Sequence, residues 1–127
     1  MTIFRCSVLI LCAGMAHAEP VTTPSGQQIT LYDVVLEPDA SIARFRYLAP
    51  AIDPAGQALT HDAVFGDFVW LCETTAIPGL AAAGKSARHV IITFSDREVD
   101  FGVATPAATQ FIESYSVEGT TCIWDAF

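Results

Sequence analysis

Alternating apolar and polar positions in the first part of the chain predict a β-hairpin. A turn is expected at PSGQ, residues 24–27, and the segment ITLYDVVLE at 29–37 is rich in β-branched and aromatic residues. After the turn PDAS, the segment IARFRYLA at 42–49 alternates, which places Arg44 and Arg46 together on one face. Both segments are therefore predicted strands, and we expect them to pair.

The pattern changes to a helical period in the middle of the chain. Thr60 is suited to be the N-cap, and Pro78-Gly79 is expected to end the helix, with a short helical turn in GLAAAG after it. Between these limits one apolar face recurs at helical spacing, formed by Val64, Phe68, Leu71, Cys72 and Thr75. We expect this face to pack against a sheet.

The C-terminal part of the chain returns to strand patterns. RHVIITFS at 88–95 is apolar on both faces and predicts a central strand, with EVDFGV at 98–103 as its partner after a tight turn at DR. Thr105 followed by Pro106 predicts a single helical turn. The final hairpin is predicted from two segments, FIESYSV at 111–117 and TCIWD at 121–125.

These elements together predict an α+β fold. Hairpins dominate, and strand-helix-strand alternation does not repeat along the chain. We therefore expect an antiparallel sheet of about six short strands, arranged as three hairpins, with one principal helix packed on one face. Residues 19–127 are expected to form this single small domain.

The first residues have the plan of a secretory signal peptide. A short positive start ending at Arg5 precedes the apolar run CSVLILCAGM, and AHA precedes Glu19. The apolar run is shorter than the roughly 20 residues that a membrane-spanning helix needs. We expect residues 1–18 to be removed and the protein to be periplasmic or secreted, without a stable membrane span; an uncleaved anchor is the alternative.

Export leaves two of the four cysteines. Cys6 and Cys12 belong to the signal segment, whereas Cys72 and Cys122 stay in an oxidising compartment. An even pair there predicts a structural disulfide. Cys72 lies on the apolar helix face and Cys122 in the last hairpin, so the bridge would fasten the helix to the sheet.

Three alternatives to the disulfide stay open at this point. Two buried free thiols would also be compatible with the pattern. A metal site is disfavoured because His61 and His89 have no ligand-like spacing to either cysteine. A nucleophilic thiol is disfavoured because Leu71 and Glu73 flank Cys72 and would raise its pKa.

The charge of the chain limits its partners. The formal net charge is −8, with 14 acidic and 6 basic residues, and the loss of Arg5 would make it one unit more negative. Such a field repels nucleic acid and anionic membrane surfaces. A basic partner is electrostatically allowed, although solubility alone explains the charge.

A weak surface site is suggested by residues near the DR turn. Asp96, Glu98 and Asp100 could hold a cation, with Glu98 and Asp100 on one face of the expected strand, but the glycine and distant glutamate of an EF-hand are missing. Arg44 and Arg46 could pair with these acids or bind an anion. Ordinary surface charge is the favoured explanation for both groups, so no metal and no cofactor is expected.

No catalytic residue can be named from the sequence. The chain lacks G-x-S-x-G, a P-loop, a dinucleotide fingerprint and H-E-x-x-H. His61 and Asp62 are adjacent, and neighbouring residues of a helix do not face each other.

Three stretches resemble a family of short exported alphaproteobacterial proteins of unknown function: LCETTAIPGL, HVIITFSDREVDFGVATPAATQF and CIWDAF. The resemblance covers roughly residues 22–127 and implies no catalytic residues. Some relatives are labelled acetolactate synthase. That enzyme is a large thiamine-diphosphate protein, whereas residues 19–127 are too few to hold its cofactor site.

The leading functional hypothesis is a non-enzymatic exported domain that binds an envelope protein or a small ligand, or assists envelope assembly. One alternative is a small periplasmic hydrolase whose site forms only in three dimensions. Another is an acidic secreted inhibitor of a basic envelope enzyme. A deep polar pocket at His61 or His89 would favour an enzyme, whereas a shallow face with exposed apolar residues would favour a binding partner.

Overall fold

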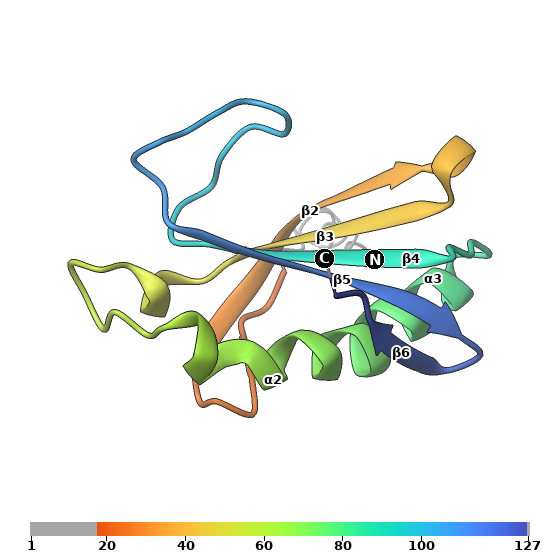
Figure 1. Ribbon diagram of the computed structural model, residues 1–127, viewed down its shortest axis with the longest axis horizontal. Coiled ribbons are helices and arrows are strands. Elements are labelled where there is room, and N and C mark those ends of the chain that lie inside the picture. Colours follow the sequence, from red (N-terminus) through yellow and green to blue (C-terminus); the bar gives the residue numbers. More distant parts are fainter. Residues whose placement is uncertain (1–17, 127) are drawn as a thin grey trace, which may run out of the picture.

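A six-stranded sheet with helices on one face forms the protein, in a computed structural model that describes residues 18–126 (Figure 1). The expected signal peptide, up to residue 17, lies outside the described residues. The strands follow the order β1 (Val21–Thr22), β2 (Gln28–Glu37), β3 (Ile42–Leu48), β4 (His89–Ser95), β5 (Gln110–Glu118) and β6 (Thr121–Trp124). The helical segments are η1 (Pro38–Ala40), η2 (Pro50–Ile52), α2 (His61–Leu71), η3 (Cys72–Ala76) and α3 (Ile77–Ala82). The predicted α+β class, six strands and principal helix are confirmed.

The central pair of the sheet differs from the prediction, because β3 and β4 are parallel. All other neighbouring strands pair antiparallel. Between β3 and β4 the chain runs back along one face of the sheet as α2, η3 and α3, so β4 starts at the same end as β3 (Figure 1). A crossover of this kind produces parallel strands, whereas a hairpin produces antiparallel ones.

The middle hairpin was wrongly predicted. EVDFGV forms no strand; it belongs to a loop at 96–109, and β4 pairs instead with β5. Gly102 has a φ of 78°, and the Val103 amide donates to the Asp100 carbonyl at 3.2 Å, which turns the segment away from the sheet. Thr105 begins a hydrogen-bonded turn to Ala108 rather than a helical turn.

The helix continues beyond the point where it was predicted to end. Thr60 is the N-cap, as expected, and accepts a hydrogen bond from the Ala63 amide at 3.2 Å. After α2 the turn widens, because the Ile77 amide donates to the Cys72 carbonyl five residues earlier. Pro78 is then the second residue of α3, a position at the start of a helical turn that tolerates a missing amide hydrogen.

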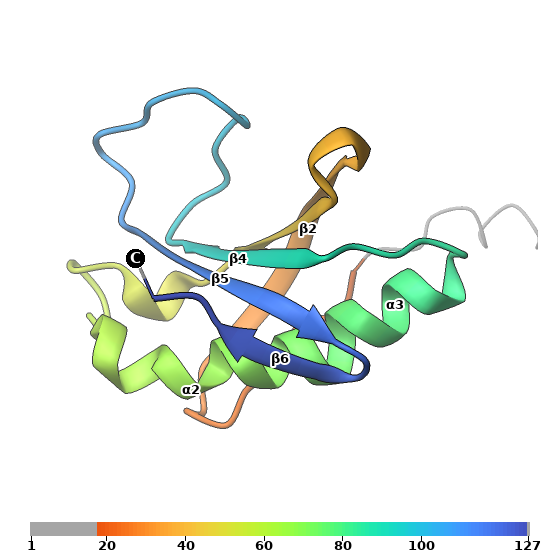
Figure 2. The same ribbon diagram turned by 45° about the vertical axis from the view of Figure 1, so that its right-hand side comes forward.

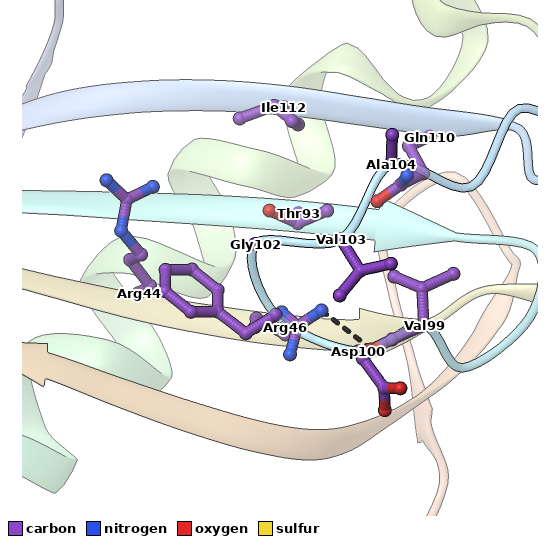
Figure 3. Close-up of a pocket in the computed structure, with 11 residues that line it drawn as sticks. Arg44, Arg46, Thr93, Val99, Asp100, Gly102, Val103, Ala104, Gln110 and Ile112 are labelled. Atoms are coloured by element: carbon purple, nitrogen blue, oxygen red, sulfur yellow. Dashed lines mark hydrogen bonds between the residues drawn. The ribbon is translucent and has the colours of Figure 1, made fainter.

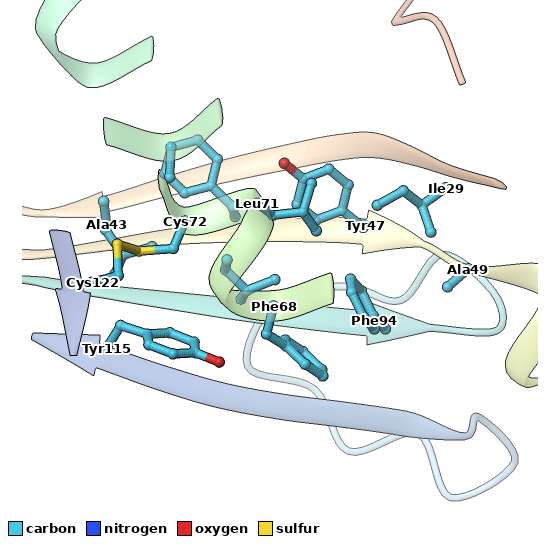
Figure 4. Close-up of a cluster of buried hydrophobic side chains, with 14 of the residues drawn as sticks. Ile29, Ala43, Tyr47, Ala49, Phe68, Leu71, Cys72, Phe94, Tyr115 and Cys122 are labelled. Atoms are coloured by element: carbon cyan, nitrogen blue, oxygen red, sulfur yellow. A yellow bond between two sulfur atoms is a disulfide. The ribbon is translucent and has the colours of Figure 1, made fainter. Parts of the chain in front are cut away.

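The core lies between this helical segment and the sheet (Figure 4). Phe68 of α2 stacks on Phe94 of β4 with ring centroids 4.2 Å apart, and Tyr47 of β3 meets Phe94 edge-on at 6.3 Å. The predicted inward positions of β3, which include Ala43 and Phe45, are buried. Burial raises the pKa of Tyr47 to about 12, so its hydroxyl stays neutral in this core.

The predicted disulfide is present. Cys72 and Cys122 are bonded, with their Cα atoms 6.3 Å apart, and the bond connects the end of α2 to β6 (Figure 4). Glu73 accepts a hydrogen bond from the Cys122 amide at 2.9 Å. This bond occupies a backbone donor of the outermost strand, so the crosslink and the carboxylate together hold the last hairpin on the helix.

A second connection between segments far apart in sequence, made by hydrogen bonds to Asp67, was not predicted. Asp67 of α2 is 1% exposed, and the turn at 24–27 surrounds its carboxylate with donors. Thr23 Oγ1 donates at 2.7 Å, Ser25 Oγ at 2.6 Å, the Ser25 amide at 2.9 Å and Gln27 Nε2 at 2.9 Å. These bonds satisfy a buried charge without a cation and fix the first turn of the protein to the helix.

Removal of the disulfide should destabilise the protein. In the chain-entropy model, the Cys72→Ala and Cys122→Ala double variant loses about 4 kcal/mol of unfolding free energy, because the bond closes a loop with a sequence separation of 50. Chemical denaturation of both proteins measures the difference. The wild-type protein of residues 19–127, denatured without a reductant, should contain no free thiol by thiol counting. Two free thiols would contradict the crosslink.

Replacing Asp67 by a neutral residue should lower the stability of the protein more than the same change at an exposed aspartate on the same helix. Asp67→Asn replaces a charged acceptor with a group that carries two donors of its own, so about 2–3 kcal/mol of stability should be lost. Asp62→Asn is the matched control, because Asp62 is exposed in the first turn and contributes about 0.3–1 kcal/mol through the helix dipole. Equal denaturation midpoints for the two variants would contradict the stabilising role of the hydrogen bonds to Asp67.

Candidate functional site

The face of the sheet opposite the helices is the candidate site. Figure 2 shows α2 and α3 on one side of the sheet and the loop at 96–109 rising from the other. The strand register aligns Arg46 of β3 with Thr93 of β4, and Thr93 with Ile112 of β5. These three side chains lie on this open face, beneath and beside the loop.

The loop and the open face enclose a pocket of about 280 Å³ (Figure 3). Its floor is formed by strand residues, and its roof by the loop. Apolar side chains on both sides are well exposed: Phe101 is 49%, Val103 57% and Ile112 57% accessible. The complete lining is Arg44, Arg46, Thr93, Val99, Asp100, Phe101, Gly102, Val103, Ala104, Gln110 and Ile112.

Arg46 anchors the loop to the sheet. Its side chain is 7% exposed, and Nη1 donates to Asp33 Oδ2 at 2.5 Å while Nη2 donates to the Val99 carbonyl at 2.8 Å (Figure 3). The guanidinium also lies 5.1 Å from the ring centroid of Tyr32 and 5.4 Å from that of Phe101. Each terminal nitrogen therefore has a protein partner, and Arg46 is a structural part of the pocket wall.

Arg44 lies in a more open position. Its Nε donates to Glu37 Oε2, and its side chain is 29% exposed. Its guanidinium is 5.5 Å from the Phe101 ring centroid. Among residues 18–126, its two terminal nitrogens have no hydrogen-bond partner. Arg44 thus carries donors that are available to a molecule in the pocket.

The predicted acidic candidates do not converge on one site. Asp96 accepts from the Arg97 Nε at 3.0 Å and from the Thr109 amide at 3.2 Å, which closes the base of the loop; its bond to Arg97 lowers its pKa. Glu98 and Asp100 line a neighbouring hollow of about 220 Å³ beside Arg46, and Asp100 also lines the open-face pocket. Since 98–103 is a loop, the strand alternation expected for these two acids does not apply.

The ion-pair partners of Arg44 and Arg46 differ from the acids considered in the sequence analysis. Arg44 pairs with Glu37 and Arg46 with Asp33, both of β2, rather than with the acids of the loop. Their predicted projection from one face of β3 is confirmed by the register. No group of three or more metal-ligating side chains occurs in the described part of the chain.

Ser116, His89 and Asp125 form a cluster with the residue types of a catalytic triad but a different order. Ser116 Oγ and Asp125 Oδ2 both approach His89 Nδ1, at 3.4 and 3.6 Å. In a working triad the serine and the aspartate contact opposite ring nitrogens. The Ser116 hydroxyl bonds directly to Asp125 Oδ1 at 2.6 Å and lowers the pKa of that carboxyl, which makes it a weaker base.

His61 takes part in a second polar cluster on the helix side of the sheet. Its Nε2 lies 2.6 Å from Glu113 Oε2, and Trp124 Nε1 donates to Glu113 Oε1 at 2.6 Å. The rings of Phe65 and Phe111 lie 5.4 and 5.5 Å from the His61 ring. Both carboxylate oxygens are engaged, so Glu113 connects the start of α2 to the last hairpin.

His61 and His89 are absent from the lining of the open-face pocket and of two further pockets, of about 160 and 220 Å³, among residues 18–126. The polar side chains that line the open-face pocket are Arg44, Arg46, Thr93, Asp100 and Gln110. The open-face pocket thus joins apolar walls to a few polar side chains.

Sequence reasoning identified three residues of this site, Arg44, Arg46 and Asp100, and missed the apolar ones. Ile112 is an exposed apolar position on a strand, and Phe101 and Val103 flank Gly102 in the loop. A run of apolar residues around a turn glycine is the only signal that distinguishes them. No helix within residues 18–126 combines the length and apolar character needed to cross a bilayer.

The comparisons with known proteins identify a family and no relative of known function. The model of a family of unknown function, DUF6497, matches residues 8–127. No curated protein and no solved structure matches the chain. The predicted resemblance to a family of unknown function is confirmed, and the match assigns no residue to a site.

Weakening the hydrogen bonds of Arg46 should release the loop at 96–109 from the sheet without unfolding the rest of the protein. Arg46→Lys keeps the charge, but a single ammonium cannot bond Asp33 and the Val99 carbonyl in the same geometry, so about 1–3 kcal/mol should be lost locally. Amide hydrogen exchange at 96–109 should accelerate while exchange in the core strands changes little. Arg97→Lys is the control within the same loop, because Arg97 is exposed and should have little effect; equal acceleration in both variants would contradict the anchoring role.

Proposed function

We propose that this chain, which belongs to the family of unknown function DUF6497, is a non-enzymatic exported binding domain. Its binding surface would be the open face of the sheet together with the loop at 96–109. The partner would be an envelope protein or a small ligand.

One observation carries this proposal: exposed apolar side chains and an available guanidinium meet at the same pocket. Phe101, Val103 and Ile112 are each about half exposed around it, and Arg44 contributes donors that have no partner among residues 18–126. Apolar surface that gathers around a hollow, with a few polar groups to orient a guest, is typical of binding sites.

The hydrolase alternative has weaker support. The clusters at His61 and His89 resemble catalytic sets by residue type, but their carboxylates are already engaged and they lie outside the pockets described above. The inhibitor alternative could use the exposed acids Glu98 and Asp100 of the loop. Those acids lie beside the apolar residues, so an interaction with a basic partner would involve the same face.

Export is part of the proposal. The disulfide between Cys72 and Cys122 is compatible with an oxidising compartment. Fractionation of cells that produce the full chain tests this point: the mature protein should be found outside the cytoplasm with its cysteines oxidised.

Charges placed on the open face should abolish binding. The Val103→Asp and Ile112→Asp double variant should lose at least about tenfold in the capture of an envelope component or a co-purifying ligand, because it puts two charges on the apolar part of the face. Val34→Asp with Leu36→Asp is the matched control: these residues are 41% and 42% exposed on β2, away from the pocket. Native mass spectrometry and quantitative capture from the envelope fraction provide the measurements.

Two outcomes would contradict the proposal. The first is equal capture by the open-face variant and its control. The second is turnover of a hydrolase substrate that is lost in Ser116→Ala or His61→Ala, which would show that one of the histidine clusters acts as a catalytic site.

A further inference from the structure

We infer that the open-face pocket binds a small organic carboxylate with an apolar body, such as a medium-chain fatty acid or an aromatic acid. This inference rests on the proposed function, because it names the chemical class of ligand for the same surface. Three features of the pocket lead to it: the number of available cations, the acids around them and the nature of the walls.

Arg44 is the more accessible of the two guanidinium groups in the pocket, with a side chain 29% exposed against 7% for Arg46. In Arg46, Nη1 donates to Asp33 and Nη2 donates to the Val99 carbonyl, and the side chain is nearly buried. In Arg44, only Nε donates to a protein group within residues 18–126, the carboxylate of Glu37. Figure 3 shows the Arg44 side chain extending from β3 separately from that of Arg46. The planar pair of terminal nitrogens in an arginine matches the two oxygens of a carboxylate. One such fork fits one anionic group.

The neighbouring acids favour a monoanion over a dianion. Glu37 already contacts Arg44, and Asp100 lines the pocket and is exposed. A carboxylate brings one negative charge into this setting, whereas a phosphate monoester brings nearly two and is repelled more strongly by the same acids. The proposed head group is therefore a carboxylate.

The walls and the volume define the rest of the ligand. Phe101 and Val103 of the loop face the pocket together with Ile112 of β5, so an apolar body would be covered by both roof and floor. A volume of about 280 Å³ lies at the lower end of small-molecule sites. Thr93 and Gln110 provide the remaining polar atoms of the lining.

The test is a titration of ¹⁵N-labelled protein, residues 19–127, with four probes of equal chain length: hexanoate, hexan-1-ol, hexylamine and hexyl phosphate. Hexanoate should shift the amide signals of 99–104 and 110–112 in a saturable way. The other three probes should bind at least about tenfold more weakly. Hexan-1-ol and hexylamine bring no negative charge to the Arg44 fork, and hexyl phosphate brings nearly two, which Glu37 and Asp100 repel more strongly.

Two pairs of variants assign the effect to the pocket. Arg44→Gln should weaken hexanoate about tenfold and bring it close to hexan-1-ol, whereas Arg88→Gln, an equal change at an exposed arginine outside the pocket lining, should not. Ile112→Ser should weaken every hexyl probe, whereas Ile123→Ser, at an exposed isoleucine of β6 outside the lining, should not. Arg44→Lys should retain part of the preference for the carboxylate. Dispersed spectra confirm that each variant is folded.

The outcomes separate this inference from the proposed function. Equal binding of hexanoate and hexan-1-ol in the pocket, or unchanged hexanoate binding by Arg44→Gln, overturns the carboxylate assignment while the open face stays a binding surface. Shifts confined to other parts of the protein, or no shift with any probe, overturn it as well. If the Val103→Asp and Ile112→Asp variant still loses its partner in that case, the proposed function stands without the carboxylate ligand.

Discussion

The return of the chain along one face of the sheet is the constraint on which the rest of the structure depends. Because α2, η3 and α3 cover this face, the strands before and after them lie side by side and parallel. The end of β4 therefore lies next to the end of β3, and the loop that leaves β4 at residue 96 starts close to Arg46. The same crossover that buries Phe68 against Phe94 thus leaves the opposite face for the loop to cover.

Side-chain hydrogen bonds, rather than strand pairing, hold the irregular segments on this framework. Asp67 gathers the donors of the turn at 24–27, and Arg46 bonds to the carbonyl of Val99 in the loop. Each is a buried charged group with several partners, and each would be costly to leave unsatisfied. The disulfide from Cys72 does the same for the last hairpin by a covalent route. Three segments far apart in sequence are thereby fixed around one helix and one strand.

Local patterns predicted what depends on local geometry. Period-two alternation placed Arg44 and Arg46 on one face of β3, and helical spacing placed Cys72 on the buried face of the helix. Parallel pairing and the order of strands depend on how a crossover runs through space, which no short window of sequence encodes. The segment at 98–103 has the composition of a strand, yet it leaves the sheet because β5 takes its place beside β4. Phe101 and Val103 come from that loop, so they were missed together with it, whereas Ile112 lies on a strand that was predicted.

The distribution of unused hydrogen-bonding capacity argues for binding over catalysis. Glu113 accepts bonds with both oxygens, and Asp125 accepts from two serine hydroxyls, so the carboxylates beside the histidines are committed to holding strands together. A general base needs a lone pair that reaches a substrate in a cavity. In the described part of the chain, Arg44 combines available donors with a pocket that also exposes the apolar side chains Phe101, Val103 and Ile112. A guanidinium can orient a guest but cannot take up its proton at neutral pH, which supports the proposal that this pocket serves recognition.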